Sequence, residues 1–118
     1  MDVNYKPTGK TTIAPEVLLT IARLTALSVP GVSRLSAIPG GVNRFFKRLD
    51  NQGVRIIVEN NVVYIDLYVI IQKDMNVRDV SRMIQTEVAR AISEMVGMEV
   101  GRVNIHIDDI DYETGEIS

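Results

Sequence analysis

The chain contains no cysteine and no tryptophan, and histidine occurs once among its 118 residues. The absence of cysteine excludes disulfides and thiolate metal sites. Long apolar runs are missing too, because the longest, 62–71, has ten residues interrupted by Asp66, about half of the ~20 that a helix needs to cross a bilayer. Residues 1–7 carry no apolar signal core. These absences predict a cytoplasmic protein without a transmembrane segment, which contacts a membrane only through a surface or a partner.

The composition is that of an ordinary globular domain. Hydrophobic residues make up 46% of the chain and charged residues 24%, which argues against disorder. A formal net charge of -2 gives no overall attraction to phosphate backbones or anionic lipid, so nucleic-acid binding is not favoured. The length fits one core. We therefore predict a flexible N-terminal leader over residues 1–10, a single domain over 11–110 and an acidic C-terminal tail over 111–118.

A first helix is predicted from Pro15 to Ser28, because proline suits the first helical position and Pro30-Gly31 ends the segment. Its apolar side chains recur at helical spacing and are expected to form one stripe that faces a sheet. They are Val17, Leu18, Ile21, Leu24 and Thr25.

A second helix is predicted between Asn76, a good N-cap with Asp79 in a capping-box-like position, and Gly97, a natural C′ residue. A last strand follows at 103–107 and turns Asn104, His106 and Asp108 away from the core. The expected buried stripe of this helix is Val80, Met83, Ile84, Val88, Ala91, Ile92 and Met95.

A β-hairpin is predicted around Asn60-Asn61, because asparagine tolerates the positive φ angles of a two-residue turn. The expected register pairs Val54 with Leu67, Arg55 with Asp66 and Ile57 with Tyr64. Opposite charges and an aromatic/β-branched pair favour this register. The whole pattern predicts an α+β fold, with a small mixed or antiparallel sheet of about four strands and two helices packed mainly on one face.

The strand over 62–71 is apolar on both faces, whereas two helices on one side can cover only one of them. The second face must therefore be covered by another part of the chain, such as Phe45-Phe46, or by another subunit. The second alternative predicts a homo-oligomer. The candidate self-association face consists of Ile57, Val62, Tyr64, Tyr68 and Ile70.

A short basic and aromatic segment is a second candidate site. It consists of Arg44, Phe45, Phe46, Lys47 and Arg48. Its cations suit phosphates and its rings suit an apolar interface or stacking on bases, so it is a candidate contact for a partner, a membrane or nucleic acid. The alternative is that both rings pack in the core of their own domain.

No catalytic or metal constellation is evident. His106 has only Asn104 and Asp108 beside it on its strand face, and two such neighbours do not make a metal site. The acidic stretch 109–116 has its glycine one place too late for a calcium loop, and Gly40-Gly41 matches no phosphate-binding motif. No nucleophile, base and orienting group can be assembled. We expect no enzymatic activity, no metal and no cofactor.

In the order and spacing of its segments the chain resembles the alkaline shock protein twenty-three family, also called the Gls-type envelope stress response family. The matching segments are Ile13-Ala14-Pro15-Glu16-Val17, Ile21-Ala22, Pro30-Gly31-Val32, 63–71, Ile84-Gln85, Met95-Val96-Gly97-Met98 and Val103-Asn104-Ile105. The resemblance implies a small bacterial protein of cell-envelope homeostasis, without known enzymatic chemistry. Some members lie beneath the membrane through an anchored partner, and some self-assemble. The chain departs from the family pattern at Gln72-Lys73-Asp74 and in the basic, aromatic stretch 42–49.

Two functions follow as hypotheses. The first is a non-enzymatic scaffold or envelope stress protein that self-associates and acts near the membrane through a membrane-anchored protein partner. The alternative is a KH-like RNA-binding module in which Arg44, Lys47 and Arg48 contact phosphates. Rising salt should weaken phosphate binding steeply, whereas apolar self-association should persist.

Overall fold

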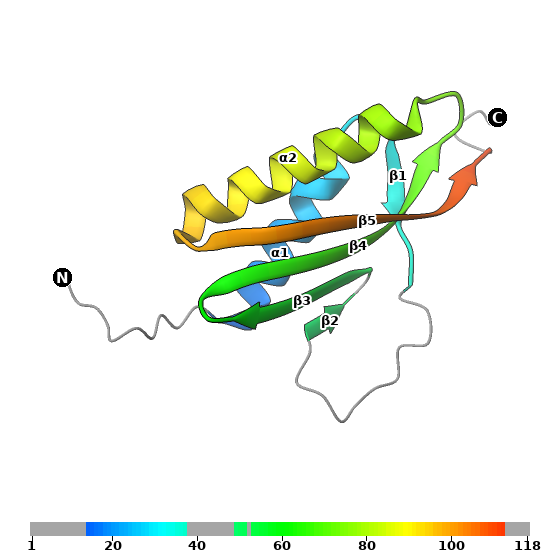
Figure 1. The fold of residues 1–118 in the computed structure, drawn as a ribbon. Coiled ribbons are helices and arrows are strands. Elements are labelled where there is room, and N and C mark those ends of the chain that lie inside the picture. The colour runs from blue at the N-terminus through cyan, green and yellow to red at the C-terminus, as the bar shows by residue number, and fades with distance from the viewer. Residues whose placement is uncertain (1–13, 38–48, 52, 113–118) are drawn as a thin grey trace.

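The computed structural model describes residues 14–37, 49–51 and 53–112 (Figure 1). The predicted leader over 1–10 and most of the predicted acidic tail lie outside the described residues, so these boundaries stay predictions. The elements, in chain order, are α1 (Pro15–Ser28), β1 (Val32–Leu35), β2 (Leu49–Asn51), β3 (Val54–Glu59), β4 (Val62–Gln72), α2 (Val77–Val96) and β5 (Glu99–Asp111).

Helix α1 begins at Pro15 with Glu16 in its first turn, as predicted, and the chain becomes extended at Val29. The predicted stripe is wrong in part, because Val17 is 41% exposed and Leu24 is 54% exposed. The helix instead packs through a neighbouring row that includes two alanines, which let its backbone approach the sheet closely. The buried side chains are Leu18, Leu19, Ala22 and Ala26.

Helix α2 has both predicted ends. The Asn76 side chain accepts a hydrogen bond from the Asp79 backbone N–H at 3.0 Å, and Gly97 ends the helix with a φ of 72°. Its buried side chains fall at every fourth position: Val80, Ile84, Val88 and Ile92. The predicted burial of Met83 and Met95 is wrong, since they are 46% and 69% exposed. Ala89 and Val96 beside this row are partly buried and pack against the same core.

The hairpin forms as predicted. Asn60 and Asn61 have φ angles of 52° and 68°, which a turn with two positive φ values requires. β3 pairs with β4 in the expected register, with Arg55 opposite Asp66 and Ile57 opposite Tyr64. Two adjacent asparagines therefore fix which side chains share each face of the sheet.

β4 is the central strand of a mixed sheet. β5 pairs with it in parallel from Val62 to Gln72. On the other border of β4 two strands pair antiparallel, β3 with residues 62–67 and β1 with residues 69–71. β2 pairs with β3. The predicted α+β class is confirmed, and the sheet has five strands in the part of the chain that the structure describes, one more than expected, because both 32–35 and 49–51 join it.

Both helices lie on the same side of this sheet (Figure 1). The core forms between them and the alternate residues of β3, β4 and β5, and its largest fully buried side chains are Ile56, Ile65, Leu67, Ile71, Ile84 and Ile92. Neither helix in the described ranges combines the length and apolarity that a membrane crossing requires. The opposite side of the sheet carries no helix among the described residues, and it holds four of the five predicted self-association residues.

Candidate functional site

Alternation along the strands creates the helix-free face of the sheet. In β4, Val63, Ile65 and Leu67 are buried against the helices, whereas the residues between them point to the other side and remain partly exposed. The neighbouring strands add the residues that lie opposite. We define the helix-free face by Arg55, Ile57, Glu59, Val62, Tyr64, Asp66, Tyr68, Arg102, Asn104 and His106.

One half of the helix-free face carries three apolar or aromatic side chains, with the exposed Glu59 opposite Val62 and the exposed Arg102 opposite Tyr64 beside them. Ile57 is 41% exposed and lies opposite the half-buried Tyr64. Tyr64 and Val62 lean over Gly101 of β5, where an added Cβ would lie 2.6 Å from Tyr64 Cε1 and 2.8 Å from Val62 Cγ1. Gly101 is the extra residue of a bulge, because Val63 pairs with Val100 and Tyr64 pairs with Arg102. The missing side chain of Gly101 thus leaves room for Val62 and Tyr64. Together with Ile57, which lies opposite Tyr64, they form the apolar patch.

The other half combines aromatic and polar groups from three neighbouring strands. The rings of Tyr68 and His106 stack with centroids 4.4 Å apart and planes 11° apart, and the Arg55 guanidinium lies 5.7 Å from the Tyr68 centroid. Asp66 Oδ1 accepts a hydrogen bond from Asn104 Nδ2 at 3.1 Å and lies 2.9 Å from His106 Nε2. The Asp66 carboxylate is therefore partnered within the face, which lowers the cost of covering it.

Four of the five predicted self-association residues, Ile57, Val62, Tyr64 and Tyr68, lie together on the helix-free face. The fifth, Ile70, offers no accessible surface, because it is only 7% exposed. It lies between Arg34 of β1 and Asp109 of β5, where both borders of β4 are occupied. The expectation that Ile70 is available for association is therefore wrong.

The basic and aromatic segment, Arg44 to Arg48, lies outside the described residues. Its role as a partner, membrane or nucleic-acid contact therefore stays a prediction, and so does the RNA-binding alternative that depends on it. His106 faces Asp66 rather than a ligand set. Within the described ranges, no three histidine or acidic side chains come together in a way that could hold a metal ion.

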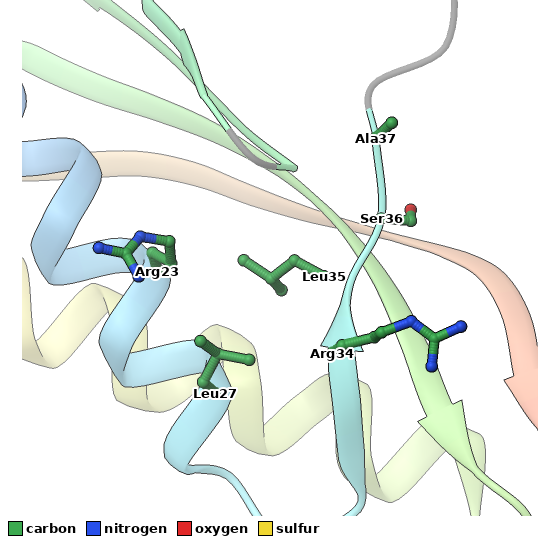
Figure 2. Close-up of a pocket in the computed structure, with 6 residues that line it drawn as sticks. All are labelled: Arg23, Leu27, Arg34, Leu35, Ser36 and Ala37. Carbon is green, nitrogen blue, oxygen red and sulfur yellow. The ribbon is translucent and has the colours of Figure 1, made fainter.

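A hollow of about 380 Å³ lies between α1 and β1. Leu27 and Leu35 line it, while the guanidinium groups of Arg23 and Arg34 point away from each other (Figure 2). Arg34 is instead paired with Asp111 at 3.1 Å. The Ser36 hydroxyl is buried, and it has no hydrogen-bond partner among the residues that the structure describes. The described residues that line the hollow therefore do not bring their cations together, and a small ligand is usually fixed by several aligned polar groups.

The fold and the helix-free face together define a small α+β domain with both described helices on one side of the sheet and a sheet surface on the other. The chain belongs to the alkaline shock protein twenty-three family, whose description reads "cell envelope-related function" and whose model matches residues 4–112. The resemblance noted in the sequence is thereby confirmed.

Two relatives are similar over most of their length. The uncharacterized protein YqhY of Bacillus subtilis (strain 168) is 29% identical over 116 residues, which cover 97% of this chain and 86% of the relative. The uncharacterized protein Spy1535 of Streptococcus pyogenes serotype M6 is 32% identical over 103 residues, covering 86% and 79%. The match thus extends over the whole described domain.

Solved structures with the same fold are distant in sequence. A structure described as "MamM CTD - Copper form" has a TM-score of 0.58 and 12% identity, and the match covers 87% of this chain and 91% of that one. A zinc form of a variant of that domain has a TM-score of 0.52, 12% identity and coverages of 84% and 90%. At this identity the likeness concerns the fold alone.

Proposed function

We propose that this protein is a non-enzymatic scaffold of cell-envelope homeostasis that self-associates through the helix-free face. The observation that carries the proposal is the apolar patch of Ile57, Val62 and Tyr64 on a side of the sheet where no described helix lies. Covering this patch with a second copy would remove apolar surface from water. Self-association is thus the simplest use of this surface.

The polar half of the helix-free face supports the same proposal. Tyrosine and arginine are enriched in protein interfaces, because they combine large contact area with a polar end. Here the side chains of Tyr68, His106 and Asp66 already contact one another or Arg55. A partner can therefore cover them without leaving the carboxylate unpaired.

The place of action that we propose is the cytoplasmic side of the membrane, reached through a membrane-anchored protein partner. The family description supports a role connected with the envelope. An exposed apolar row on α1 is available for such a partner while the helix-free face is engaged. It consists of Val17, Leu24 and Leu27, which are 41%, 54% and 39% exposed.

A lysine at Ile57 tests the proposed interface. Ile57→Lys is expected to weaken self-association at least tenfold, because a charge would have to lose its water in the centre of the apolar patch. Sedimentation velocity over a range of concentrations measures the change. Since Ile57 is 41% exposed in the single copy, the variant should remain folded, and circular dichroism checks this.

The matched control is Leu24→Lys, which places the same charge at a more exposed leucine of α1 on the other side of the molecule. This variant should associate like the parent protein. Equal weakening by both substitutions, or a parent protein that stays monomeric at the highest concentration, would refute the proposed face.

A further inference from the structure

β5 is a long strand, and in the described part of the chain one of its borders is unpaired. It runs over thirteen residues, Glu99–Asp111, and pairs in parallel with β4. Among the described residues, no strand lies along its other border (Figure 1). Bulges at Gly101 and Asp108 interrupt the register with β4, so the regular stretch is 102–107, and Asp108 follows directly at its end. Such a border is a template for another strand unless the protein blocks it.

The backbone groups on this border can be identified. Gln85 Nε2 of α2 donates a hydrogen bond to the Val103 carbonyl at 2.9 Å, so this carbonyl faces away from β4. Because alternate residues of a strand direct their backbone groups to the same side, Ile105 and Ile107 present theirs to the same border. The Gln85 side chain thus occupies the Val103 carbonyl, and a partner strand could bond to the backbone groups of Ile105 and Ile107.

We propose that β5 pairs antiparallel with β5 of a second copy about a two-fold axis at Ile105. In this register Ile105 lies opposite its own copy, and the residues with outward backbone groups face one another. The other opposite pairs are Arg102 with Asp108, Asn104 with His106 and Val103 with Ile107.

Charge complementarity selects this register. The two-fold axis forms the pair of Arg102 and Asp108 twice, and all four side chains are exposed in the single copy. Moving the axis by one residue places Arg102 opposite His106 or opposite Ile110, and both ion pairs are lost. If the two-fold axis falls between two residues of β5 instead of on one residue, apolar side chains of one copy lie opposite polar side chains of the other. Opposite charges on facing strands stabilise the pairing, and like charges destabilise it.

The core along β5 gives the pairing an apolar contribution. Ile105 and Ile107 face the helices but are only partly buried, because the core ends at this border. A second copy would continue the sheet and cover these side chains. Gln85 would have to release the Val103 carbonyl. The Ile107 backbone N–H of the second copy would then donate to this carbonyl in place of the Gln85 side-chain amide, so one hydrogen bond replaces another at little net cost in free energy.

This interface differs from the helix-free face and does not depend on it. A copy that uses both would have two different two-fold surfaces, and alternating them produces assemblies larger than a dimer. The two proposals can fail separately, because Ile57 is remote from the β5 border in the pairing order of the sheet.

Charge reversal tests the register. Arg102→Asp and Asp108→Arg, made singly, each place two like-charged pairs across the axis and are expected to weaken edge pairing at least tenfold at low salt. The double variant restores opposite charges and should associate within about threefold of the parent protein. The background is Ile57→Lys, so that only edge pairing is measured by sedimentation velocity. Single variants without effect, or a folded double variant that is not restored, would overturn the proposal.

Disulfide trapping gives a second, independent measurement. Because the chain has no cysteine, Ile105→Cys introduces a single thiol, and the two Cα atoms of a hydrogen-bonded antiparallel pair lie about 5.5 Å apart, which is within disulfide range. Mild oxidation should yield a linked dimer much faster than in Thr20→Cys, a control at an exposed position of α1. Equal rates for the two variants would contradict pairing at β5.

Discussion

Replacement of Leu67 by alanine is expected to lower the free energy of unfolding by about 3–4 kcal/mol, in the middle of the range for fully buried leucines. Leu67 is 0% exposed and lies in β4, which has a strand on each border. Paired on both sides, its backbone cannot move into the space that the side chain leaves. A cavity therefore adds to the lost apolar contact.

Urea denaturation at fixed protein concentration measures this change, because association makes the apparent stability depend on concentration. Leu24→Ala is the matched control, with the same change of atoms at a site that is 54% exposed, and it should cost less than about 0.5 kcal/mol. Similar losses in the two variants would show that β4 is not the centre of the core.

Replacement of Gly53 by alanine has the second large expected effect, a loss of about 2–5 kcal/mol that combines a left-handed backbone with overpacking. Gly53 has a φ of 87°, and an added Cβ would lie 2.5 Å from the Ser36 carbonyl oxygen and 2.9 Å from Leu35 Cβ. The Gly53 carbonyl also accepts the Tyr68 backbone N–H at 2.9 Å. At this point the end of β1 meets the start of β3 along one border of β4, and there is no room for a methyl group.

Gly97→Ala separates the two contributions. Gly97 has a similar φ of 72°, but an added Cβ meets nothing within 4 Å. Its loss should therefore stay near the backbone cost alone, about 1–2 kcal/mol. Thermal or urea unfolding of both variants gives the comparison. If Gly97→Ala costs as much as Gly53→Ala, the close meeting of β1 and β3 is not as described.

Local signals in the sequence were sufficient for the elements that depend on local chemistry. Asn60-Asn61 predicted the hairpin register because the turn requires positive φ at both positions. Asn76 and Gly97 predicted both ends of α2, since a cap is made within a few residues of the chain. In each case the determining interaction joins neighbours in sequence.

Packing partners were harder to predict. The periodicity of α1 and α2 gave an apolar sector, but it could not tell which row touches the sheet, so Val17, Leu24, Met83 and Met95 were placed in the core and are exposed. Ile70 was predicted to be exposed because the alternation of residues along β4 gives no information about the neighbouring strands, here β1 and β5. Both errors come from contacts between segments that are far apart in the chain.

The candidate site could be predicted only in part, and again the local features were the predictable ones. Alternation within β4 was sufficient to bring Tyr64 and Tyr68 to one face, and the hairpin register added Ile57. The stacking of Tyr68 on His106 and the contact of Asp66 with Asn104 could not be predicted, because they require the parallel register of β5, which is set only after α2 has crossed the sheet. Gly101 was missed for the same reason.

The helix-free face is proposed to be covered by a second copy, and intermolecular nuclear Overhauser effects detect such a contact in solution. In a mixture of ¹³C-methyl-labelled and unlabelled protein, we expect contacts between the Ile57 methyl groups of one copy and the Tyr64 or Tyr68 ring protons of another. Intermolecular contacts confined to α1 and α2, or none at concentrations where the protein sediments as an oligomer, would contradict it.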